Sequence, residues 1–103
     1  SALSGGEKAF VAIAIYFAIL KVKPSPFCIL DEIEAALDEV NVSRYARYLK
    51  NLSDKTQFIA ITHRRGTMEE ADILYGVTMQ EKGVSRLLEL DITQLESRLG
   101  MKA

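Results

Sequence analysis

A run of twelve apolar residues, Ala9–Leu20, limits the possible folds of this chain more than any other feature. Lys8 and Lys21 lie at its two ends, and the run is too short to span a bilayer and lacks a signal-peptide cleavage pattern. A helix that is apolar on every side must be buried on every side. We therefore expect a core helix inside a structure larger than 103 residues can easily build, and no membrane partner.

The composition is that of one small soluble domain. Of the 103 residues, 49% are apolar and 26% are charged, and the net charge of −1 gives no basic tail or strip for nucleic acid. The single cysteine, Cys28, lies inside the apolar stretch Phe27–Leu30, where a buried thiol acts as a small hydrophobe. This cysteine usage indicates a reducing cytoplasm.

Two short apolar stretches predict buried strands. Phe27–Leu30 is followed by two acids, and Thr56–Thr62 is followed by His63. Between them, Val40–Leu52 has the periodicity of an amphipathic helix. A strand, a helix and a strand in this order predict parallel pairing, and hence an α/β fold.

The remaining part of the chain predicts shorter elements. A capping-box pattern predicts a short helix over Thr67–Ala71, with Thr67 as its N-cap. Ile73–Gln80 and Val84–Leu90 predict a pair of strands joined by a glycine-containing turn. A second capping pattern predicts a short helix that begins at Thr93.

Ser4, Gly5 and Gly6 lie directly before the apolar run. Glycines allow backbone N–H groups to approach a ligand closely, and the positive end of the helix dipole favours an anion such as a phosphate. A serine N-cap followed by permissive glycines is the simpler interpretation, and these three residues alone favour it.

Acids and the single histidine follow the predicted strands. Asp31 is placed at the sheet edge, as the Mg²⁺-binding acid of a Walker B strand is, and Glu32 could polarise a water for attack on phosphorus. Acids also end strands as ordinary turn residues, and Asp38 is expected to cap the next helix whatever else it does. His63 should lie at the same sheet edge as Asp31 and Glu32, which favours a catalytic role.

The chain contains four motifs in the order LSGGEKA, CILDE, AALD and ITH. Their order and spacing together are far more specific than any one motif. They resemble the signature motif, Walker B strand, D-loop and switch histidine of ATP-binding-cassette ATPases. Over residues 3–90 the chain resembles the C-terminal head lobe of bacterial SMC (structural maintenance of chromosomes) proteins. Glu7 separates it from membrane transporters of this class, which usually carry glutamine at that place.

The resemblance implies a site for ATP and Mg²⁺. Residues Ser4–Glu7 would bind, in trans, the γ-phosphate of an ATP held by a second head. Asp31 would help to hold Mg²⁺, and Glu32 would activate the attacking water. Asp38 would couple the two sites of a head dimer, and His63 would sense the γ-phosphate.

The resemblance also implies partners. The sequence lacks the P-loop motif G-x-x-x-x-G-K-[ST] that cradles phosphates. Residues 1–90 are therefore expected to form a C-terminal lobe that is incomplete and inactive without an N-terminal P-loop lobe, with 91–103 as a short helix or tail. We expect that lobe and a long coiled coil to precede Ser1. We also expect a strand of that lobe to lie along one edge of Thr56–Thr62.

Three further partners follow from the same resemblance. A second head would form a homodimer with the first, and the winged-helix domain of a kleisin would dock near Ile73–Leu90 or the final helix. DNA would be engaged through the full complex, which condenses and segregates chromosomes in the bacterial cytoplasm.

Two other functions stay open. The chain could be a kleisin-binding module without activity of its own, or the head lobe of a DNA-repair ATPase of the RecN or zinc-hook type. The adjacent Arg64 and Arg65 could meet phosphate, DNA or a neighbouring acid, but we favour a solvated turn.

Overall fold

The computed structural model describes residues 4–90, which fall into two units, 4–70 and 71–90. The first unit contains three helices and two strands: α1 (Gly5–Val22), β1 (Phe27–Asp31), α2 (Glu39–Leu52), β2 (Gln57–Ile61) and α3 (Arg65–Met68). The predicted core helix, amphipathic helix and two strands are confirmed, with ends that differ by at most four residues.

Strands β1 and β2 pair in parallel, as predicted. Phe27 lies opposite Gln57, and Asp31 lies opposite Ile61, with α2 as the crossover between the two strands. Because the strands are parallel, their carboxyl ends meet at one edge of the sheet. The residues that follow both strands are therefore close together.

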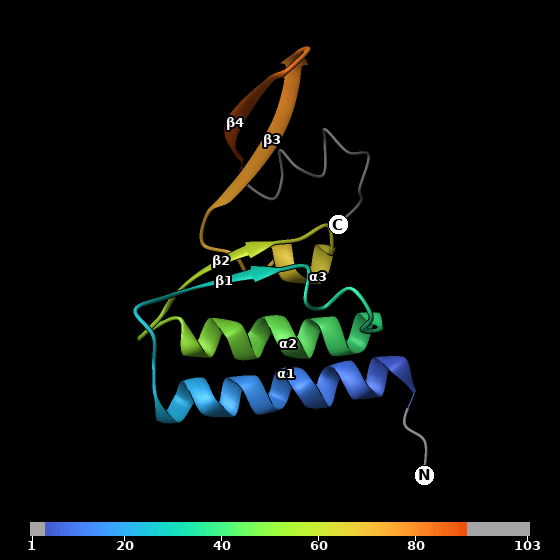
Figure 1. Ribbon diagram of the computed structural model, residues 1–103, viewed down its shortest axis with the longest axis vertical. Coiled ribbons are helices and arrows are strands. Elements are labelled where there is room, and N and C mark those ends of the chain that lie inside the picture. The colour runs from blue at the N-terminus through green and yellow to red at the C-terminus, as the bar shows by residue number, and fades with distance from the viewer. Residues whose placement is uncertain (1–3, 91–103) are drawn as a thin grey trace. The chain divides into compact units, whose positions relative to one another are not determined.

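Helices α1 and α2 lie side by side on the same side of this sheet (Figure 1). The ring of Phe17 on α1 is the centre of the core, with its centroid 5.8 Å from that of Tyr45 and 6.3 Å from that of Phe58. Cys28 and Leu30 point from β1 into the same core. The predicted burial of the single cysteine is confirmed, and its Sγ lies 2.8 Å from the hydroxyl of Tyr16.

Helix α1 is not buried on every side within this chain. One stripe, which includes Ile13 and Phe17, is buried in the core. A second stripe is exposed, with Val11 at 46%, Ile15 at 57% and Ile19 at 59%. An apolar face of this helix is therefore left uncovered by the described residues 4–90.

The face of the β1–β2 sheet that points away from the core is apolar as well. Its large exposed side chains are Phe27, Ile29, Ile59 and Ile61. Within the described residues 4–90, no third strand is hydrogen-bonded to either edge of this sheet. The prediction that a strand of another lobe lies along the free edge of β2 stays a prediction.

The second unit contains one hairpin, in which β3 (Leu74–Glu81) pairs antiparallel with β4 (Val84–Leu90). Gly83 has a φ of 82° in the connecting turn, a conformation that favours glycine. The strand pair is predicted correctly. The predicted helix at Thr93 and the tail 91–103 lie outside the described residues. Among the described residues, no helix is long and apolar enough to cross a membrane.

Candidate functional site

The carboxyl edge of the parallel sheet brings together Glu32 and His63, the two predicted catalytic residues. Nδ1 of His63 lies 2.6 Å from Oε1 of Glu32. A carboxylate accepts hydrogen bonds, so Nδ1 of His63 donates to Glu32 and Nε2 faces away from this contact. The side chains of His63 and Glu32 are 68% and 48% exposed, which leaves both open to a ligand at this edge.

The backbone at Glu32 has an unusual conformation. Its φ is 52°, the only positive φ at a non-glycine residue in the described part of the chain. The left-handed region costs an L-residue about 1–2 kcal/mol. The backbone N–H of Glu32 donates to the carbonyl oxygen of Ile61 over 2.8 Å, which ties the end of β1 to the end of β2. Such strain is concentrated at functional sites, where the surrounding structure holds it in place.

Asp31 is the last residue of β1 and is exposed at the same edge. No three acidic, histidine or cysteine side chains of the described residues are grouped so that they could hold a metal alone. Mg²⁺ is commonly bound by one or two carboxylates together with substrate phosphates and waters. A single exposed carboxylate at Asp31 fits that mode of binding, with phosphate oxygens as the further ligands.

Ser4 caps α1, as the simpler interpretation of the glycine stretch predicts. Its side-chain oxygen accepts a hydrogen bond from the backbone N–H of Glu7 over 3.1 Å. The two glycines differ: a Cβ at Gly6 would lie 3.0 Å from the backbone oxygen of Ala36, and a Cβ at Gly5 would meet no atom within 4 Å. Gly6 therefore permits close packing of the helix start against the loop after β1, and Gly5 has no such packing role.

Asp38 caps α2, as predicted, since its Oδ1 accepts a hydrogen bond from the backbone N–H of Asn41 over 2.8 Å. Residues 32–37 form a loop of turns and bends between β1 and this cap. The carboxylate of Asp38 is thereby held at the end of the same loop that begins with Glu32.

The interpretation of Arg64 and Arg65 as a solvated turn is wrong. Nη1 of Arg64 donates to the carbonyl oxygens of the loop residues Glu34, Ala35 and Leu37, at 3.2, 3.2 and 2.8 Å. Nε of Arg65 donates to Oε1 of Glu69 over 2.8 Å. Arg64 is therefore bound by three backbone carbonyls. Arg65 is bound by an acid one helical turn away. Both cations are engaged with the protein.

Glu34 is a buried polar residue that the sequence motifs do not indicate. Its side chain is 1% exposed, and its Oε2 accepts hydrogen bonds from Oγ1 of Thr62 (2.9 Å) and Oγ1 of Thr67 (2.6 Å). The prediction that Thr67 caps a short helix is wrong, because α3 begins two residues earlier and the Thr67 hydroxyl is bound to Glu34. Burial, and to a lesser extent the charge of Glu34, raises the pKa of Tyr45. The apolar neighbours of Glu34 are the sequence signal that could have indicated its burial.

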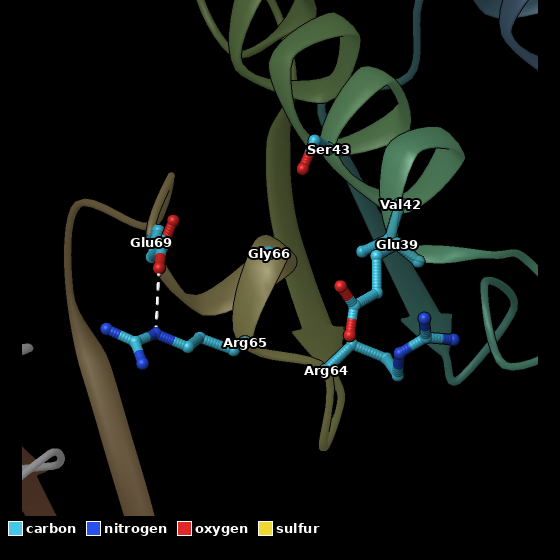
Figure 2. A pocket seen from close by; sticks show the side chains of 7 residues that line it. All are labelled: Glu39, Val42, Ser43, Arg64, Arg65, Gly66 and Glu69. Atoms are coloured by element: carbon cyan, nitrogen blue, oxygen red, sulfur yellow. Dashed lines mark hydrogen bonds and ion pairs between the residues drawn. The ribbon is translucent and has the colours of Figure 1, made fainter. Parts of the chain in front are cut away.

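A pocket of about 380 Å³ lies between α2 and α3. It is lined by Glu39, Val42, Ser43, Arg64, Arg65, Gly66 and Glu69. Figure 2 shows the two arginine side chains pointing in opposite directions, Arg65 toward Glu69 and Arg64 away from it. The cations therefore do not converge on a common anion in this pocket.

The model of the RecF/RecN/SMC N terminal domain family matches residues 1–86. The chain belongs to this family. The chromosome partition protein Smc of Bacillus subtilis (strain 168) is 66% identical over 92 residues, which make up 89% of this chain and 8% of that protein. The chain thus spans about 8% of the length of the curated SMC relatives it matches.

Solved SMC heads share the fold. A chain from work on ATP-driven dimerization and DNA-stimulated activation of SMC ATPases is 45% identical, with a TM-score of 0.89 over 95% of this chain and 60% of that chain. The Smc head domain of Pyrococcus furiosus, with an extended coiled coil and bound to the C-terminal domain of ScpA, is 46% identical, with a TM-score of 0.80. It is matched over 96% of this chain and 25% of that one. The chain is therefore part of an SMC head with an α/β fold.

Proposed function

We propose that this chain is the C-terminal lobe of an SMC head, and that it completes an ATPase site whose P-loop is supplied by an N-terminal lobe. The observation that carries this proposal is the contact between Glu32 and His63 directly beside Asp31. The sequence contains no P-loop motif of its own, which supports the assignment to the C-terminal lobe.

The reaction assigned to this site is the transfer of the γ-phosphoryl group of ATP to water. Glu32 accepts the proton of the attacking water, and its exposed carboxylate can reach a ligand at the sheet edge. His63 orients that carboxylate through Nδ1 and presents Nε2 to the γ-phosphate. Asp31 would hold Mg²⁺, which neutralises charge on the phosphates when it is bound.

The signature residues Ser4–Glu7 act in trans in this proposal. They form the first turn of α1, where backbone N–H groups and the helix dipole favour an anion. The Ser4 side chain and Gly5 are exposed, so the surface of a second head can reach them. Asp38, at the end of the loop after Glu32, would link the two sites of the head dimer.

The partners follow from the same family. The kleisin contact is assigned to the β3–β4 hairpin or the residues after it, supported by a similar head bound to the C-terminal domain of ScpA. DNA is engaged through the full complex in the bacterial cytoplasm, for chromosome condensation and segregation. A kleisin-binding module without activity is the second candidate, and the absent P-loop motif is the observation that favours it.

The substitution Glu32→Gln in the full-length protein tests the proposal. It removes the basic carboxylate and keeps the side-chain size, so we expect ATP binding to persist while turnover falls about 100-fold or more. Heads engaged through ATP should accumulate, which site-specific cross-linking would measure. Near-normal turnover in this variant would exclude Glu32 as the base.

A further inference from the structure

A buried carboxylate links the two chain segments that carry the proposed catalytic pair. Glu34 follows Glu32 by two residues, and Thr62 directly precedes His63. Oγ1 of Thr62 donates to Oε2 of Glu34 over 2.9 Å, so this one hydrogen bond joins the loop after β1 to the end of β2. Hydrogen bonds to a charged acceptor are roughly twice as strong as neutral ones. The bond to Glu34 can therefore hold the loop and the end of β2 in a fixed position.

The same threonine connects this link to Arg64. The backbone N–H of Arg64 donates to Oγ1 of Thr62 over 2.9 Å. The Arg64 guanidinium then reaches the carbonyl oxygen of Leu37 over 2.8 Å, one residue before Asp38. Thr62 and Arg64 therefore tie the segment before His63 to the loop after β1 at Glu34 and at Leu37, the residue before Asp38.

We propose that Glu34, Thr62 and Arg64 are positioning residues that hold the Glu32–His63 pair and the loop to Asp38 in the reactive arrangement. This inference rests on the proposed ATPase function. It also accounts for the positive φ of Glu32, because that conformation persists only where the surrounding contacts determine it. A misplacement of about 1 Å in such a site lowers turnover by about 100-fold without a matching loss of substrate binding.

The test uses the full-length protein with Thr62→Val, which keeps the side-chain shape and removes both hydrogen bonds of the hydroxyl. We expect kcat for ATP hydrolysis to fall by about 10- to 100-fold, while KM changes by about twofold or less. Thr62→Ser retains the hydroxyl and should restore kcat to about half of the original value or more. Glu34→Gln weakens both hydroxyl contacts and should also lower kcat. This variant provides a second test if Thr62→Val folds poorly.

Thr56 is the matched control, because it is a buried threonine directly before β2, as Thr62 is the threonine directly after it. Its Oγ1 donates to the carbonyl oxygen of Ser25 over 2.7 Å. Thr56→Val removes one buried hydrogen bond, so it should lower the melting temperature and leave kcat within about twofold. Equal losses of kcat in the two variants, or a rise in KM alone for Thr62→Val, would overturn the inference. Normal turnover in Glu32→Gln would instead contradict the proposed function itself.

Discussion

Ser4 combines an observed structural role with a proposed functional role at the same position. It caps α1 through the backbone N–H of Glu7, and it is placed where an anion would meet the start of the helix. Loss of an N-cap destabilises a helix by about 1 kcal/mol. For any substitution of Ser4, a loss of function must therefore be distinguished from a loss of stability.

Two substitutions separate these roles in a head reconstituted from this chain and the P-loop lobe of the same protein. Ser4→Arg removes the cap and adds bulk, and Ser4→Asp keeps a good capping side chain but places a negative charge against the phosphate. We expect both variants to lose ATP-dependent head dimerisation, measured by sedimentation, while the ATP affinity of a single head changes by about twofold or less. A parallel loss of ATP affinity in the single head would place Ser4 in a cis site and contradict the assignment in trans.

At the scale of elements, the packing of α3 on α2 depends on Gly66. A Cβ at this position would lie 2.9 Å from Cγ1 of the buried Val42, which is closer than real Cβ contacts. The contact brings α3, and with it Thr67, close enough for the hydroxyl to reach Glu34. Gly66 therefore determines how the short helix sits beside the site.

Gly66→Ala should lower the free energy of unfolding by about 1–3 kcal/mol because of overpacking against Val42. Val42→Ala removes the clashing methyl group, so the double variant should lose less stability than the two single variants added together. Chemical denaturation of the four proteins of this double-mutant cycle gives the coupling energy. Strict additivity would show that the clash with Val42 is not the cause.

The sequence predicts the elements of this chain better than the contacts between them. Apolar periodicity is local, so Phe27–Leu30 and Thr56–Thr62 were predicted as parallel strands, and the meeting of Glu32 and His63 at one edge followed from that pairing. The position of α3 could not be predicted in the same way. The Thr67 hydroxyl bonds to Glu34, which lies 33 residues away in the sequence, so no local pattern contains this information.

At the scale of the whole molecule, two apolar faces that residues 4–90 leave uncovered are the strongest argument for the proposed N-terminal lobe. One is the exposed stripe of α1, and the other is the outer face of the β1–β2 sheet, where Ile29 is 59% exposed and Ile61 is 50% exposed. Full burial of one such side chain contributes roughly 1.5–3 kcal/mol. An unpaired strand edge beside them adds backbone groups that require a partner.

The central claim is that this chain completes a nucleotide site and does not form one alone. Its most direct test is the binding of a fluorescent ATP analogue, measured by titration, to residues 1–103 with and without the co-expressed P-loop lobe of the same protein. We predict no saturable binding to residues 1–103 alone, and saturable binding with Mg²⁺-dependent hydrolysis once the P-loop lobe is present. Equal affinity with and without that lobe, or a folded complex of the two that binds no nucleotide, would contradict the account.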